Sequence, residues 1–544
     1  MSMKSPSISD WCKIALLAIT LSPPQISSAQ TLALTVSNQI ATVAWPASAI
    51  YYLLQTNADL LPTNLWGNVG SGSALSVLVP GGSGAVLTNN FTNGTFSFTQ
   101  PMSNARQFYQ LKAPTLIPVF GFAIFYNQLL EFSGSATMML NGFIHANGDI
   151  EVGTVSSAAQ TFNGTVTTTG TISSPANGGY TTNTLTGPVT FNAKPPLATN
   201  VPAFISPLGT NSLHGLIEIP PVTESVLSLL GQSRLYNLAQ VVLVISNSPA
   251  GGAPSVRLYL QTSYNGLPPG SDLARVIRVL TNATDTFLRT NSTLSLPFLS
   301  LSNTFTDQRE MRANLLVTQI DVNQYQSWLL TNSLAIGKFT GGNYPTVLFV
   351  ADQRSSGTNN LSVVRLVNGV KLPNNNGLGF TVATPNPLYV LGSYNTTVNS
   401  NTYANTLGAT TNGATVPAAL IADAITILSP NWLDAASAAS YTTRPAASMT
   451  VNAALLTGIV PSIGIAATNF SGGVHNLPRF LENWTGATFT LNTSLVCLFS
   501  SQMATNRFQF PGAYYSPPTR LWGFDQNFSS PNKLPPGTIF YTLP

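Results

Sequence analysis

A ten-residue pattern that recurs at a fixed interval constrains the fold of this chain more than any other feature. The pattern NGxxxxxGxI occupies residues 141–150 and recurs at residues 163–172, which is 22 residues later. A weaker third copy begins at Gly187, 23 residues after Gly164. Glycine tolerates the backbone conformations of sharp corners, and a period of about 20–25 residues is typical of one turn of a solenoid. The repeat therefore predicts a β-solenoid built from short strands.

The first copy of the repeat also contains the residues that most resemble a metal site, His145 and Asp149. In the second copy, Thr167 and Thr171 occupy the same positions. Because the frame is kept while the titratable residues are replaced, a structural corner explains this stretch better than chemistry does. A metal site at His145 and Asp149 is the weaker alternative, and the DxDxDG spacing of a calcium loop is absent.

Few of the residues are charged, which bears on both the fold and the partners. Charged side chains make up 7% of the chain, against about 25% in an average soluble protein. Asn, Thr, Ser and Gln must therefore form most of the surface, which favours stacked β-structure over long solvated helices. The formal net charge of +4 is not concentrated in a Lys/Arg cluster, and this argues against nucleic acid as a partner.

The first 29 residues have the pattern of a secretory signal peptide. Lys4 and Lys13 lie before a short apolar run at residues 14–21, and small residues lead up to Ala29. A membrane anchor is the alternative, but this run is too short to cross about 30 Å of hydrocarbon. We therefore predict cleavage near Ala29 and a secreted or cell-surface location. Cys497 is then the single remaining cysteine and cannot form an internal disulfide.

The front of the mature chain is predicted to contain two β-rich segments. Short alternating runs separated by Gly-rich turns at residues 30–113 predict a β-sandwich. The repeat places the first solenoid rungs at residues 114–200. An apolar run at residues 118–126 is too short to span a membrane and is predicted to be a buried strand.

The rest of the chain is predicted to carry an insertion and then return to the solenoid. Charges concentrate at residues 201–350, and the spacing of apolar residues predicts a helix at 322–332, with further helices at 222–230 and 273–280. This region is interpreted as a mixed α/β insertion. Strand-like runs at 351–470 continue the solenoid, and residues 471–544 are predicted to cap it. The expected fold class is mainly β: an N-terminal β-sandwich followed by a parallel β-helix that carries the insertion.

Several stretches between residues 115 and 544 together resemble one family of proteins. They include AIFY at 123–126, NGFIHANG at 141–148 and DQRE at 307–310, with further stretches at 383–390, 422–429, 478–484 and 514–520. In these stretches the chain is similar to exported bacterial proteins related to PilX-type pilus-assembly proteins. The resemblance implies a surface or pilus-associated role and supplies no catalytic residues.

The predicted sandwich carries a second resemblance. The stretches VAWP at 43–46, YLLQT at 52–56 and RQFYQL at 106–111 resemble a fibronectin type III-like module, which is usually an adaptor without chemistry. Pilin-like proteins begin instead with a long apolar helix that packs in a fibre. This chain differs from pilin-like proteins in that a predicted sandwich takes the place of the N-terminal helix.

Three acidic residues in the C-terminal third are the candidate catalytic groups: Asp423, Glu482 and Asp525. Paired carboxylates on a β-helix can cleave polysaccharide, one as an acid and the other as a base or nucleophile. Buried pairs with nearby arginines that fix solenoid corners are the favoured explanation of the same residues. The arginines are Arg444, Arg479 and Arg520.

The remaining side chains with reactive chemistry do not form a recognisable motif. His145, His214 and His475 lack the spacing of a zinc site. Cys497 lies in an apolar run, so it is expected to be a buried small hydrophobe and not a nucleophile. No cofactor is predicted.

Two functions of different classes follow from these observations. The favoured one is a non-catalytic, exported structural or adhesion protein of the cell surface or of a pilus. The alternative is a protein that binds or cleaves polysaccharide along the solenoid. The expected partners are cell-surface or extracellular polysaccharide, or other surface or pilus proteins, and the membrane is involved only through export.

Overall fold

The computed structural model describes short strands in the first 115 residues and most of residues 116–542. The longest gaps in the second part lie at 175–186, 261–277, 280–288 and 403–414. The predicted signal peptide at 1–29 lies outside the described residues. Among the described residues, no helix is both long and apolar enough to cross a membrane.

The front of the chain forms two antiparallel sheets. One has the order β1-β2-β6-β5 and the other the order β4-β3-β7. The strands are β1 (Ala33–Ser37), β2 (Ile40–Pro46), β3 (Leu53–Asn57), β4 (Gly67–Asn68), β5 (Val86–Asn90), β6 (Thr95–Pro101) and β7 (Phe108–Lys112). Most of the alternating runs in the sequence are therefore confirmed as strands, although the run at 76–79 lies outside the described residues. The packing of the two sheets as a sandwich stays a prediction.

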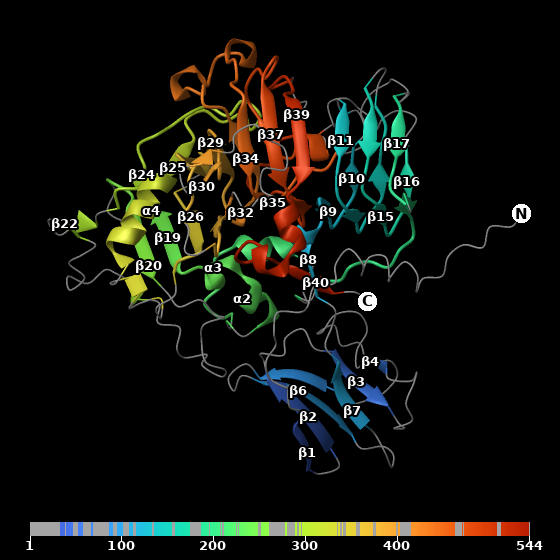
Figure 1. Ribbon diagram of the computed structural model, residues 1–544. Helices are drawn as coiled ribbons and strands as arrows, with labels where there is room; N and C mark the ends of the chain where they lie inside the picture. The colour runs from blue at the N-terminus through green and yellow to red at the C-terminus, as the bar shows by residue number, and fades with distance from the viewer. Residues whose placement is uncertain are drawn as a thin grey trace, which may run out of the picture.

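A 12-stranded sheet runs through the rest of the molecule (Figure 1). Its neighbours pair in parallel except at one end, where β19, β20 and β21 pair antiparallel. In spatial order the strands are β18 (Leu197–Ala198), β15 (Val166–Thr168), β12 (Ile144–Ala146), β9 (Ile124–Tyr126), β38 (Leu495–Cys497), β35 (Ala454–Thr457), β32 (Ala418–Ala422), β28 (Phe380–Ala383), β26 (Val347–Asp352), β19 (Val241–Ser246), β20 (Ser255–Leu260) and β21 (Arg278–Val279).

The order of these strands brings the end of the chain against its beginning. Strand β38 pairs in parallel with β9, so Leu495 lies opposite Ile124. Strand β40 (Phe540–Thr542) likewise pairs with β8 (Leu116–Pro118). Strands from the last part of the chain therefore lie next to strands from residues 116–126 (Figure 1). Strands from the segments predicted as an insertion and as a cap lie in the same sheets as the segments between them.

Several shorter sheets accompany the 12-stranded sheet. A six-stranded sheet has the order β24-β25-β27-β29-β33-β36, and three three-stranded parallel sheets have the orders β34-β37-β39, β10-β13-β16 and β11-β14-β17. The strands of the first are β24 (Leu299–Ser300), β25 (Leu316–Asp321), β27 (Ser362–Val367), β29 (Leu388–Leu391), β33 (Ile425–Leu428) and β36 (Arg479–Phe480). The others are β34 (Met449–Asn452), β37 (Thr488–Thr493), β39 (Thr519–Phe524), β10 (Leu130–Glu131), β13 (Ile150–Glu151), β16 (Ile172–Ser173), β11 (Met138–Leu140), β14 (Gln160–Phe162) and β17 (Val189–Phe191). Two-stranded hairpins are formed by β22 (Arg289–Thr290) with β23 (Thr293–Leu294) and by β30 (Thr397–Val398) with β31 (Asn401–Thr402). The described fold is mainly β with parallel sheets.

The 22-residue interval is the register of the strands between the first two copies of the repeat. Ile144 lies opposite Val166, and Ile150 lies opposite Ile172. The glycine corner leaves no room for a side chain, because a Cβ atom on Gly164 would overlap the carbonyl oxygen of Gly142. The repeat thus sets both the strand pairing and the corner packing.

The predicted third copy is wrong in its starting point. Asn163 Nδ2 donates to Asn141 Oδ1 (2.8 Å), and Asn192 Nδ2 donates to Asn163 Oδ1 (2.8 Å), so Asn192 continues the corner. Gly187 instead donates its N–H to the Thr154 carbonyl (2.9 Å). The interval from Asn163 to Asn192 is 29 residues, against 22 from Asn141 to Asn163.

Both faces of the 12-stranded sheet are covered, as expected for strands that read as continuous apolar runs. On β35, Leu455 packs into one core cluster, while Ala454 and Leu456 pack into the other. The second cluster also takes up apolar residues from the 3-10 helix η4 (Leu213–Ile217) and the short helix α3 (Leu235–Leu238), which follows α2 (Leu229–Ser233).

The helix predicted at 322–332 is confirmed as α4 (Val322–Thr331). Asp321 caps its start by accepting the Gln324 N–H (2.9 Å), and Tyr325 and Trp328 face the core. The helix predicted at 273–280 is wrong where that segment is described, because Arg278–Val279 forms β21 and pairs with β20.

Three other predictions are corrected in detail. The helix predicted at 222–230 overlaps α2 only at its last two residues. The buried strand predicted at 118–126 is divided by the 3-10 helix η3 (Val119–Gly121). The strand-like run at 449–455 is divided between β34 and β35.

Candidate functional site

The Asp423 carboxylate lies at the turn between β32 and β33 and is surrounded by donors. The backbone N–H groups of Gln502, Met503 and Ala504 donate to it, the last two at 3.1 and 2.8 Å. His214 Nε2 lies 3.1 Å from Asp423 Oδ1. Burial raises the pKa of the carboxyl, but the bonds from His214 and from the backbone outweigh burial and lower it. Asp423 is therefore a charged anchor for this loop.

Glu482 and Asp525 are also buried, and each accepts hydrogen bonds: Glu482 from a segment 53 residues away, and Asp525 from the residues that follow it. Ser429 donates to Glu482 through its backbone N–H (2.6 Å) and its hydroxyl (2.7 Å). Burial raises the pKa of Glu482, and the bonds from Ser429 and the charge of Arg444 oppose this. Asp525 accepts the Asn527 N–H (3.0 Å) at the start of the 3-10 helix η13 (Gln526–Ser529). The three candidate carboxylates thus serve three different local structures.

Of the nearby arginines, Arg444 interacts through its charge with Glu482, and the three arginines also make the following contacts. Arg479 forms its ion pair with Glu310. Arg444 donates to backbone carbonyls, including that of Leu481 (2.6 Å). The guanidinium of Arg520 lies over the Trp522 ring at 5.3 Å.

His145 and Asp149 have separate structural roles. His145 is fully buried, and its two ring nitrogens lie 2.8 Å from Thr167 Oγ1 and 3.0 Å from Asn147 Oδ1. Burial lowers the pKa of His145 to about 4, so the ring is neutral at physiological pH. Asp149 accepts the backbone N–H of Thr171 (2.7 Å) and its hydroxyl (2.9 Å). Within the described part of the chain, no group of three or more His, Cys, Asp or Glu side chains could hold a metal ion.

Sequence reasoning missed that His214 bridges two carboxylates. Its Nδ1 lies 2.8 Å from Glu218 Oε1, opposite the contact of its Nε2 with Asp423. Burial lowers the pKa of His214, but the two carboxylates outweigh it, and the pKa is raised from 6.5. The i,i+4 spacing of His214 and Glu218 was a readable signal. No signal in the sequence linked His214 to Asp423, which is 209 residues away.

This bridge predicts a stability that falls with rising pH. A raised pKa in the folded state stabilises the protein below the unfolded pKa, and this stability is lost as the pH rises through the folded pKa. We expect the melting temperature to decline from pH 6.5 toward pH 9, and His214→Gln to flatten that slope. His145→Gln is the matched control, since His145 stays neutral throughout this range. An unchanged slope in His214→Gln would contradict the ionic bridge.

A second buried ionic cluster joins the 307–310 turn to β36. Glu310 Oε1 lies 2.6 Å from Arg479 Nη1, and Glu310 Oε2 accepts the Asn506 N–H (3.1 Å). The Tyr389 hydroxyl donates to Asp307 Oδ2 (2.5 Å). Burial raises the pKa of Glu310, while the charge of Arg479 opposes this rise. These charged residues could be identified in the sequence, but the contacts between them could not be predicted from it.

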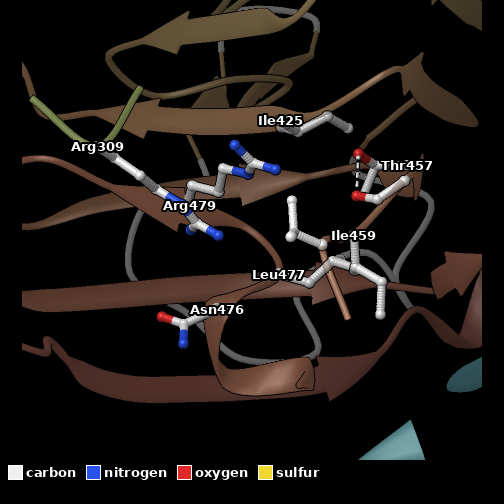
Figure 2. Close-up of a pocket in the computed structure, with 9 residues that line it drawn as sticks. Arg309, Ile425, Thr457, Ile459, Asn476, Leu477 and Arg479 are labelled. Atoms are coloured by element: carbon white, nitrogen blue, oxygen red, sulfur yellow. Dashed lines mark hydrogen bonds between the residues drawn. The ribbon is translucent and has the colours of Figure 1, made fainter. Parts of the chain in front are cut away.

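A small pocket opens beside this cluster. Figure 2 shows the guanidinium groups of Arg309 and Arg479 directed toward a space bounded by Thr457, Ile459 and Leu477. The space open to the centre of a water-sized molecule is about 10 Å³, which is close to the room that a single water needs. The pocket can hold a very small ligand but not a sugar unit.

Another pair of carboxylates, which the sequence analysis did not select, lies in register on adjacent strands. Glu131 of β10 lies opposite Glu151 of β13. Burial and, after it, the charge of Glu151 raise the pKa of Glu131 to about 7. Like charges directly opposite each other disfavour double ionisation. The only sequence signal was the recurrence of an aliphatic-Glu dipeptide 20 residues apart.

Cys497 is buried in β38, as its apolar surroundings predicted. Burial raises the pKa of its thiol to about 12, and a neutral thiol is a poor nucleophile.

No protein-family model, curated protein or solved structure matches this chain. The candidate sites are therefore judged on their geometry alone.

Proposed function

We propose that this is a non-catalytic, exported structural or adhesion protein of the cell surface or of a pilus. In this proposal an N-terminal sandwich precedes a parallel β-helix. The β-helix is supported by the parallel pairing across successive rungs and by the 22-residue register. The ladder of corner Asn side chains, in which Asn163 links Asn141 to Asn192, supports it as well.

The observation that carries the proposal is the engagement of the candidate carboxylates. Asp423 accepts three backbone N–H groups and contacts His214. Glu482 accepts two bonds from Ser429. Carboxylates held in this way stabilise loops, because rearranging them during a reaction would leave buried donors without acceptors. A structural role for these acids fits this arrangement better than acid–base chemistry.

The second candidate function, binding or cleavage of polysaccharide, is favoured by one observation. Glu131 and Glu151 lie on adjacent strands, and the pKa of Glu131 of about 7 would suit a general acid. Against this candidate, Glu131 is only 3% exposed, so a glycan has little access to it. The structural role therefore remains the stronger proposal.

Fractionation of cells that produce the protein, followed by protease treatment of intact cells, tests the choice. We expect the protein to stay with the cells and to be removed by the protease. Free release into the medium would contradict the surface role and favour the second candidate. A screen for polysaccharide cleavage would follow, with Glu131→Gln and Glu151→Gln as the inactive variants and Asp149→Asn as the control. If Asp423→Asn and Glu482→Gln proteins with an intact fold are the only variants that lose cleavage, Asp423 and Glu482 are the catalytic carboxylates, as the alternative prediction from the sequence has it.

A further inference from the structure

The guanidinium of Arg309 is buried with fewer partners than it has donors. The side chain is 3% exposed. Its Nε donates to the Asn506 carbonyl (3.3 Å), and its Nη2 lies 3.5 Å from Ser471 Oγ. It also lies 6.0 Å from the centre of the Phe508 ring. A guanidinium has five N–H donors, and among the described residues only Asn506 and Ser471 accept from Arg309.

The acids closest to Arg309 in the chain are turned to other donors. Asp307 accepts from the Tyr389 hydroxyl and from the Glu310 N–H (3.0 Å). The carboxylate of Glu310 is divided between Arg479 and the backbone of Asn506. Among the residues that the structure describes, no carboxylate forms an ion pair with Arg309.

A buried cation is costly, and although the charges of Glu310 and Asp307 favour the charged form of Arg309, a second cation lies beside it. Burial and, after it, the charge of Arg479 lower the pKa of Arg309 to about 9. Arg309 still carries its charge at neutral pH. Both guanidinium groups face the same pocket (Figure 2), so its positive potential is not cancelled on the pocket side.

We infer that the pocket between Arg309 and Arg479 is a binding site for a small monovalent anion of about the size of chloride. The two guanidinium groups supply donors and positive charge, and the side chains of Ile459 and Leu477 form an apolar wall. The space of about 10 Å³ for the centre of a water-sized molecule sets the size limit. A halide is a single atom and is therefore the smallest candidate anion, whereas sulfate and sugar acids are larger. The bound anion accepts from the guanidinium of Arg309, with which no described carboxylate forms an ion pair.

The full-length mature protein in chloride, bromide or gluconate at one ionic strength provides the test. Gluconate is too large for the pocket. We expect chloride and bromide to raise the melting temperature by about 2–4 °C over gluconate, since a ligand that binds only the folded state stabilises it. Arg309→Gln should abolish this difference. Arg257→Gln, which changes an exposed arginine of β20, should leave the difference unchanged.

An equal response to all three anions in the wild-type protein would overturn the inference. So would a halide response that persists in Arg309→Gln. If that variant does not fold, bromide soaked into crystals of the wild-type protein decides the matter. An anomalous peak beside Arg309 and Arg479 supports the site, and its absence at saturating bromide overturns it.

Discussion

Replacing Asp423 with alanine should destabilise the protein by about 4 kcal/mol or more. The substitution leaves the N–H groups of Gln502, Met503 and Ala504 without their acceptor and removes one carboxylate from His214. Each donor that loses its partner in a buried site costs about 1–3 kcal/mol. Even the lower limit, applied to three donors and the imidazole of His214, is large against the stability of an ordinary domain. Urea unfolding followed by tryptophan fluorescence measures the change.

Two further variants separate the cause from a general effect of losing an acid. Asp423→Asn keeps one acceptor oxygen and the shape of the side chain, so about half of the loss should remain. Asp149→Ala also removes two hydrogen bonds, from the Thr171 N–H and hydroxyl. These bonds are exposed, so water can replace Asp149, and the cost should be about 1 kcal/mol or less. An Asp423→Ala protein as stable as Asp149→Ala would show that Asp423 does not anchor its loop.

The parts of the fold that could be predicted are those that depend on residues close together in the sequence. The 22-residue interval fixed a pairing in which His145 lies opposite Thr167, because a repeated corner repeats its strands. Two of the strand-like runs within 351–470, at residues 380–383 and 388–391, are β28 and β29. The order of the rungs could not be predicted. Nothing in the composition of β38 indicates that it pairs with β9, far away in the sequence.

The candidate site was harder to predict than the fold because its contacts depend on that order. Asp423, Glu482 and Asp525 were selected as acids near arginines in the sequence, yet their bonds come largely from backbone N–H groups, which every residue except proline has. Glu310 and Arg479 are 169 residues apart and meet only when the sheets assemble. A sequence can supply the types of charge, but their pairing is a property of the assembled rungs.

Removing the guanidinium of Arg479 should be comparably damaging. Arg479→Met should cost about 3–5 kcal/mol, the usual range for a buried ion pair that loses one partner. Arg479 is 5% exposed and Glu310 is 4% exposed, so water cannot replace the lost charge. The variant also removes the donor to the Ala504 carbonyl (2.8 Å). The free energy of unfolding measured in urea gives the cost.

A double-mutant cycle with Glu310→Gln isolates the ion pair from the other contacts of Arg479. Because Arg479→Met leaves Glu310 as an unpaired buried charge, neutralising Glu310 as well should recover about 2 kcal/mol. Arg365→Met is the matched control, since its partner Asp434 is bound at 2.6 Å but has a side chain that is 29% exposed. Water can hydrate Asp434 after that change, so the loss should be smaller, about 1–2 kcal/mol. Additive effects of Arg479→Met and Glu310→Gln would mean that the two charges do not stabilise each other, and that the 307–310 turn is held to β36 by its remaining contacts.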